Sequence, residues 1–140
     1  MADFSVTAAG VVKRSGATTT SGTAGATITA GKAVYLDSND SKWKLGNCET
    51  STTTAGLNGV GVALHGAADG QPLNVITAGD WYAGAAAVEG EDYYMSGTAG
   101  GLAPRADLSN VAPDYRTLVC TGLANGDMRM LPSYTGAQVQ

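Results

Sequence analysis

The stretch Thr29-Ala-Gly-Lys-Ala-Val-Tyr-Leu-Asp37 contains the two signals that decide the fold. Its first three residues, Thr-Ala-Gly, favour a tight reversal, because glycine adopts positive φ at no steric cost. The residues that follow alternate between the two faces of an extended chain, with Val34 and Leu36 on one face. Ala33 and Tyr35 lie on the other face. A short strand that begins after a glycine turn is therefore predicted here.

The same tripeptide punctuates the rest of the chain. Each copy lies beside a short run of alternating apolar and polar residues, which is typical of half-buried strands. About eight to ten such strands, ~10 residues apart and without a long helical pattern, are typical of a sandwich or a small barrel. We predict an all-β fold, a short-stranded antiparallel β-sandwich or small β-barrel with an extended N-terminal arm. The five copies are Thr23–Gly25, Thr29–Gly31, Thr54–Gly56, Thr77–Gly79 and Thr98–Gly100.

The individual strands follow from the alternating runs. A hairpin is predicted from residues 33–37 to 42–45, with Trp43 and Leu45 facing inward. A turn is predicted at 78–80 and one short helical turn within 107–115. The chain is thereby divided into an extended or flexible N-terminal arm (1–22), a β-rich domain (23–131) and a C-terminal tail (132–140). Further strands are predicted at 26–30, 60–64, 73–77, 93–95, 116–121 and 127–131.

Composition limits how stable a single copy can be. A chain of 140 residues is sized for one domain. Much of its apolar content is alanine, and it contains one phenylalanine and 20 glycines. Small side chains bury little area, and glycine loses the most backbone entropy on folding. We expect contacts with other chains to supply part of the stability.

Charge and hydropathy exclude two classes of partner. Charged residues make up 14% of the chain and the net charge is −4. A nucleic-acid-binding protein needs a basic stripe, whereas the basic clusters here are Lys13-Arg14 and the pair Lys42 and Lys44. No apolar run approaches the ~18 residues of a membrane helix. We predict no nucleic-acid or membrane partner, and synthesis in a cytoplasm because residues 1–4 do not begin a signal peptide.

The residues offer little for catalysis. A catalytic triad has to use His65, the single histidine, with Asp69 four residues later. No Gly-x-Ser-x-Gly elbow presents a nucleophile, so a loop histidine bonded to backbone or solvent is the favoured reading. We predict that the chain is not an enzyme and binds no cofactor.

Metal and disulfide sites are equally weak. The run Asp37-Ser-Asn-Asp-Ser41 resembles the start of a calcium loop but lacks the later glycine and glutamate, and the acids of 89–92 are read as capping a turn. No metal site is predicted. Cys48 and Cys120 belong to no metal-binding motif; free thiols are favoured over a disulfide, and Cys120 is read as a small buried hydrophobe.

The aromatic residues are the candidate interface. Trp81-Tyr82 and Tyr93-Tyr94 are adjacent pairs, so in a strand one member points inward and the other outward. Exposed aromatic side chains anchor interfaces, whereas buried ones line the core. We expect one residue of each pair to be in the core. Trp43 completes the set of candidate interface residues.

Turn and strand patterns recur in four segments, residues 23–36, 59–64, 67–75 and 90–104. Together these segments resemble the capsid decoration, or cement, proteins of tailed bacteriophages. The resemblance implies a β-rich domain that binds the outer face of an icosahedral capsid at junctions between major capsid protein subunits. It also implies a homo-oligomer, commonly a homotrimer, with no catalytic residues and with the capsid exterior of the virion as its location. Residues 1–21 and 132–140 fall outside its clearest part.

The function expected from these observations is that of a virion structural protein that stabilises contacts between capsid subunits. The alternative is a head-fibre or tail-associated module that binds carbohydrate or a receptor. In that case Trp43, Trp81 and Tyr82 stack on sugar rings. A hydrolase that uses His65 is the third hypothesis and the least favoured.

Overall fold

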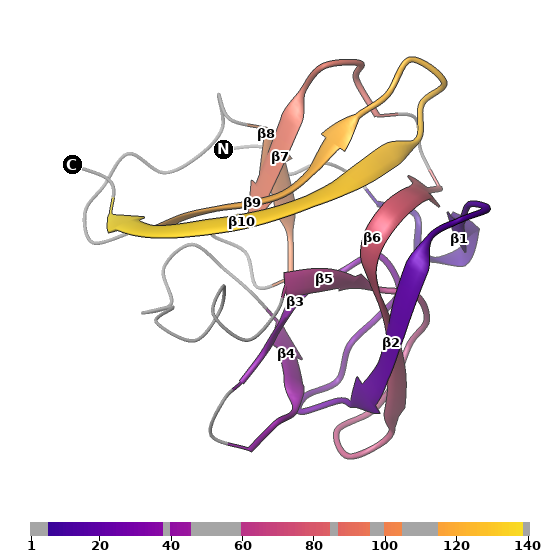
Figure 1. The fold of residues 1–140 in the computed structure, drawn as a ribbon. Helices are drawn as coiled ribbons and strands as arrows, with labels where there is room; N and C mark the ends of the chain where they lie inside the picture. Colours follow the sequence, from indigo (N-terminus) through magenta and orange to yellow (C-terminus); the bar gives the residue numbers. More distant parts are fainter. Residues whose placement is uncertain are drawn as a thin grey trace.

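The computed structural model describes residues 6–37, 40–45, 60–84, 87–95, 100–104 and 115–138. In these ranges the chain forms one 3-10 turn, Ala8–Gly10, and strands that join in a single antiparallel sheet curled into a half-barrel (Figure 1). The prediction of an all-β antiparallel fold is confirmed. The strands are β1 (Val11–Lys13), β2 (Thr18–Thr23), β3 (Ala33–Leu36), β4 (Trp43–Leu45), β5 (Val60–Ala63), β6 (Pro72–Ala83), β7 (Asp92–Met95), β8 (Leu102–Pro104), β9 (Tyr115–Gly122) and β10 (Met128–Gln138).

The long strand β6 belongs to both halves of the sheet. Its first half pairs with β2 and β5, and its second half pairs with β1 and β10. Gly79 lies between the halves with a φ of 88°. The turn predicted at 78–80 is wrong: both halves of β6 keep their partners, so the positive φ bends the strand without reversing it.

The first half of the molecule is a small curled sheet in the order β2-β6-β5-β3-β4. Its two end strands meet, because Ala24 forms a parallel bridge with Trp43 and the Gly25 N–H donates to the Trp43 carbonyl at 2.7 Å. The hairpin predicted from 33–37 to 42–45 is confirmed as β3 and β4. The strand predicted at 26–30 is wrong, since Ile28 alone pairs there, in an isolated bridge.

The second half has the strand order β6-β10-β9-β7-β8. Here β10 continues to Gln138, so residues 132–138 are not the predicted tail. A bulge between Met130 and Ser133 lets the pairing with β9 resume beyond Pro132, which has no N–H to donate. The predicted strands at 60–64, 93–95, 116–121 and 127–131 correspond to β5, β7, β9 and β10.

The segment predicted as an N-terminal arm contributes two strands to the sheet. Both β1 and β2 pair along one side of β6, and the predicted boundary between residues 22 and 23 falls inside β2. Most of the predicted helical turn, residues 107–114, lies outside the described residues.

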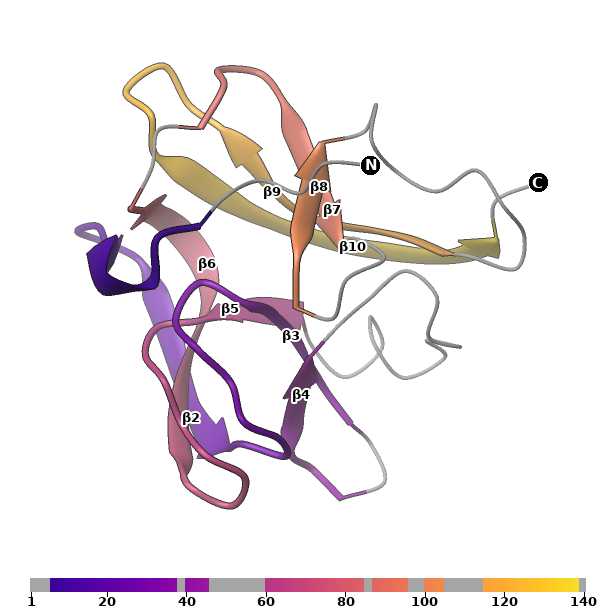
Figure 2. The same ribbon diagram turned by 180° about the vertical axis from the view of Figure 1, so that it is seen from behind.

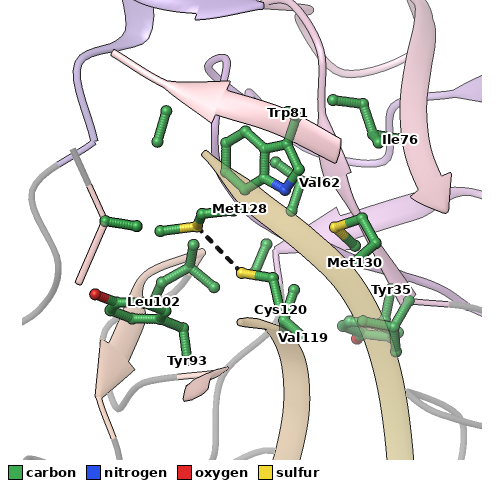
Figure 3. Close-up of a cluster of buried hydrophobic side chains, with 14 residues drawn as sticks. Tyr35, Val62, Ile76, Trp81, Tyr93, Leu102, Val119, Cys120, Met128 and Met130 are labelled. Atoms are coloured by element: carbon green, nitrogen blue, oxygen red, sulfur yellow. Dashed lines mark hydrogen bonds between the residues drawn. The ribbon is translucent and has the colours of Figure 1, made fainter. Parts of the chain in front are cut away.

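Two apolar cores lie on either side of a wall made of β3, β5 and the adjoining part of β6. Figure 2 shows β3 and β5, which belong to the small curled sheet, between the layer of β7 to β10 and the rest of that sheet. The wall is buried on both faces, because alternate residues of each strand face different cores. The smaller core contains Ala24, Ile28, Val34, Trp43, Ala63, Ala67, Leu73 and Val75. The larger core contains Ala33, Tyr35, Val60, Val62, Ile76, Trp81, Ala83, Ala87, Tyr93, Leu102, Val119, Cys120, Met128 and Met130 (Figure 3).

Candidate interaction surface

The two adjacent aromatic pairs divide as predicted, with one residue of each in the core. Trp81 and Tyr93 are buried, whereas Tyr82 and Tyr94 are partly exposed. Trp43 is also buried, as the inward orientation predicted for the hairpin requires. Three of the five predicted interface residues therefore belong to the cores, because alternation along a strand sends every second side chain inward. Tyr82 and Tyr94 remain available to a partner.

The buried aromatic residues differ in how their polar atoms are satisfied. The Tyr93 hydroxyl accepts a hydrogen bond from the Val88 N–H at 3.2 Å. The Trp81 Nε1 is buried and has no hydrogen-bond partner among the described residues. Figure 3 shows Trp81 pointing into the larger core, where the Cys120 Sγ approaches the Met128 Sδ at 3.3 Å. Neither tryptophan is placed to stack on an external ring.

Tyr82 lies on the outer face of β6, opposite Val12 of β1. The Val12 side chain is 47% exposed. The guanidinium carbon of Arg14 lies 5.3 Å from the centre of the Tyr82 ring, within the range of a cation–π contact. These three side chains form a patch, here called the Tyr82 patch, that combines an apolar surface with a charged, planar donor.

Arg14 is fixed by a second partner. Its Nε and Nη2 donate to the Asp127 carboxylate at 3.0 and 3.1 Å, in the bidentate geometry that suits a guanidinium. The Asp127 side chain is 8% exposed, against 46% for Arg14. This hydrogen bond raises the pKa of Arg14. The pair joins the turn between β1 and β2 to the turn between β9 and β10.

A second ion pair lies on the same outer face. Asp80 and Arg129 are directly opposite each other on β6 and β10. The Arg129 Nε and Nη2 donate to the Asp80 carboxylate at 2.8 and 3.2 Å. The bond raises the pKa of Arg129. Two guanidinium–carboxylate pairs thus hold the outer face of the sheet in a defined arrangement next to the Tyr82 patch.

The strand β2 presents an exposed edge. Among the described residues, Thr18–Ser21 pair on one side, with β6, and their side chains are exposed. The six residues of β2, Thr-Thr-Thr-Ser-Gly-Thr, include no charge and no proline. Charged side chains and proline are two of the devices that commonly protect a sheet edge from pairing with another chain, and this strand has neither. We call Thr18–Ser21 the β2 edge.

His65, the histidine considered for a catalytic triad, makes hydrogen bonds to the backbone. The His65 Nε2 accepts a hydrogen bond from the Asn74 N–H at 3.1 Å, which leaves the proton on Nδ1, 2.9 Å from the Gly66 carbonyl. The imidazole thereby continues the pairing of β5 with β6 where β5 ends. The favoured reading of a loop histidine bonded to the backbone is confirmed.

The acidic turn between β3 and β4 is filled by an ammonium group. The Lys44 Nζ lies 2.7 Å from the Asp37 carboxylate and 3.0 Å from that of Asp40. These bonds raise the pKa of Lys44, and the Lys44 hydrogen bond lowers the pKa of Asp40. A lysine thus stands where a calcium loop would hold its cation. Within the described ranges, no group of three or more metal-ligating side chains comes together.

The cysteine thiol of the larger core is inaccessible to solvent. Cys120 is a fully buried free cysteine, as predicted, and burial raises the pKa of its thiol. A protonated thiol in an apolar core behaves as a small hydrophobe and not as a nucleophile. Cys48 lies outside the described residues.

The Arg14–Asp127 pair is the feature that sequence reasoning missed. Its members are 113 residues apart, and no local motif joins them. The Lys13-Arg14 cluster was the available signal, but it gave no indication of its partner.

No match was found when the chain was compared with protein families, with curated proteins and with solved structures. In the part of the chain that the structure describes, no helix has the length and hydrophobicity needed to cross a membrane.

Proposed function

We propose that this chain is a virion structural protein that binds the outer surface of a bacteriophage capsid and stabilises contacts between major capsid protein subunits. The resemblance of four sequence segments to capsid decoration proteins supports this proposal. The all-β fold agrees with the β-rich domain that the resemblance implies. We also propose, on the resemblance alone, that the chain acts as a homotrimer on the capsid exterior.

The observation that carries the proposal is the β2 edge. An exposed strand edge presents a row of backbone N–H and C=O groups that an extended segment of another chain can pair with. Main-chain hydrogen bonds then supply affinity, and the small neutral side chains of Thr18–Ser21 allow a close approach. A capsid protein segment that adds to this edge extends the sheet across the boundary between two proteins.

The Tyr82 patch, formed by residues of β6, β1 and the turn after β1, supplies a second contact. Tyrosine and arginine are, together with tryptophan, enriched at the energetic centre of interfaces. A stable interface buries about 800 Å² on each partner, more than a four-residue edge can provide. Contacts at the edge and at the patch add when one rigid body touches two capsid subunits.

The alternative of a carbohydrate-binding module has less support. It relied on Trp43, Trp81 and Tyr82, and the first two are buried in the cores. Tyr82 is covered on one side by the Arg14 guanidinium. We therefore retain the capsid proposal.

The test is binding to purified capsid shells that lack this protein, measured by co-sedimentation. The wild-type chain should bind to saturation, with a fixed copy number relative to the major capsid protein. Thr20→Lys places a charge at the β2 edge and should weaken binding strongly. Thr27→Lys, at an exposed threonine outside any strand, is the matched control and should bind like wild type.

Two outcomes would contradict the proposal. One is a protein that remains free in the infected lysate and is absent from purified particles by mass spectrometry. The other is a purified protein that adsorbs to host cells or to a glycan array and does not sediment with shells, which would favour the receptor-binding alternative.

A further inference from the structure

The turn between β9 and β10 contains the dipeptide Asn125-Gly126. The chain has two Asn-Gly steps, at Asn58-Gly59 and Asn125-Gly126, and the second lies within the described residues. An asparagine before a glycine is the arrangement in which the next backbone nitrogen reaches the side-chain carbonyl carbon most easily, because glycine has no side chain to obstruct the approach. The Asn125 side chain is exposed to water, the other reactant.

Hydrogen bonds in the turn hold both reacting groups. The Asn125 Oδ1 accepts from the Asp127 N–H at 3.1 Å, and the Asn125 Nδ2 donates to the Asp127 carboxylate at 3.3 Å. The attacking atom, the Gly126 nitrogen, donates its hydrogen to the Leu123 carbonyl at 3.1 Å. The carboxylate that holds the Asn125 amide is itself held by Arg14.

We propose that Asn125 is a site of spontaneous deamidation whose rate in the folded protein is set by the Arg14–Asp127 pair. Hydroxide removes the proton of the Gly126 nitrogen, and this nitrogen forms a bond to the Asn125 Cγ. The bond from Cγ to Nδ2 breaks and ammonia leaves with a proton from water. Water then opens the resulting succinimide at either carbonyl, which gives aspartate or isoaspartate at position 125.

The product changes the turn that protected it. A carboxylate replaces the amide that donated to Asp127, so two like charges face each other where a hydrogen bond stood. The isoaspartate product also lengthens the backbone next to Gly126, whose carbonyl accepts from the Ala87 N–H at 3.0 Å. Deamidation therefore weakens the junction at which the β9–β10 turn, the N-terminal strands and the segment before β7 meet.

The test compares deamidation rates in the folded full-length chain by peptide mass mapping, with isoaspartate measured by enzymatic methylation. Arg14→Met removes the guanidinium that holds Asp127 and should speed the reaction at Asn125 several-fold. Arg129→Met removes the guanidinium of the Asp80 pair and should leave the rate unchanged. The reaction at Asn58 in the same samples is the internal control and should not differ between Arg14→Met and wild type.

A urea-denatured sample gives the rate without the turn. There Asn125 should react several-fold faster than in the folded wild type and at about the same rate as Asn58. The proposal is overturned by equal rates for Asn125 in folded and denatured wild type, or by no reaction in either. It is also overturned if Arg14→Met behaves like wild type. If Arg14→Met does not fold, Asp127→Asn takes its place in the same comparison, because it removes the charge that Arg14 binds.

Discussion

The two cores of the molecule, one around Trp43 and the other around Trp81, are built in different ways. The smaller core is filled by alanine and aliphatic side chains, and Trp43 reaches it from a hairpin whose strands are adjacent in sequence. The larger core combines tryptophan and tyrosine with Met128, Met130 and Cys120, from strands far apart in the chain. The residues of the smaller core come from positions 24–75, whereas those of the larger core come from positions 33–130, so the second depends on strand pairing over longer separations.

The cores are nevertheless joined by their common wall. Val62 and Ile76 face the larger core, while their neighbours Ala63 and Val75 face the smaller one. Loss of either core exposes one face of the same strands. We therefore expect the two halves to unfold together, and the variants below test that expectation.

The largest effect is expected from removing either tryptophan. Trp43→Ala and Trp81→Ala should each lower the free energy of unfolding by about 3–5 kcal/mol, because each leaves a large cavity in a close-packed core. Urea denaturation followed by circular dichroism should show a single transition in both variants. Two separate transitions in either variant would mean that the halves are independent.

Trp81→Phe sharpens this comparison. It removes the buried Nε1–H that has no described partner, and an unsatisfied buried donor costs about 1–3 kcal/mol. Removing this donor offsets part of the free energy that is lost with the smaller buried apolar area. This variant should therefore lose much less stability than Trp81→Ala. An equal loss for the two variants would contradict this expectation.

An intermediate effect is expected where β2 crosses the Trp43 ring. A Cβ at Gly22 would lie 2.6 Å from the Trp43 Nε1 and 2.7 Å from its Cδ1. Gly22→Ala should therefore displace the indole and cost about 1–3 kcal/mol. Gly66→Ala, whose Cβ meets its nearest atom, the Ile28 carbonyl oxygen, at 3.5 Å, is the control and should stay within ~0.5 kcal/mol of wild type. Equal stability of the two variants would contradict this packing.

The smallest effect is expected at the acidic turn beside the smaller core. The pKa of Asp40 lies below its usual value of 3.8 because of the Lys44 hydrogen bond. Its contribution to stability is therefore present above that usual value and is lost as the pH falls through the lowered pKa. The stability difference between wild type and Lys44→Met should shrink from about pH 6 to about pH 2. A difference that stays constant over this range would exclude the proposed coupling.

The sequence was sufficient for strands whose pattern is local. The β3–β4 hairpin could be predicted because alternation and a polar turn are both encoded within residues 33–45. The same reasoning placed one aromatic residue of each adjacent pair in the core. Orientation inside a strand depends on its period of two, which a sequence displays directly.

The Thr-Ala-Gly copies show where this reasoning stops. Gly31, Gly79 and Gly100 all have positive φ, whereas Gly25 does not. Gly31 ends a turn, but Gly79 lies within β6, because partners on both sides keep the strand extended beyond it. A glycine permits a positive φ but does not decide whether the chain reverses. Strand partners decide that, as they decide the pairing of Arg14 with Asp127.

The position of β6 has a consequence for how the protein reaches its native state. Four other strands hydrogen-bond to it, and β10 reaches it from almost 50 residues further along the chain. Loop closure over such separations is slow, so folding should take milliseconds to seconds. Until this one strand is in place, the sheet of β3 to β5 is not connected to the sheet of β7 to β10. The route to the folded state is therefore expected to pass through its pairing.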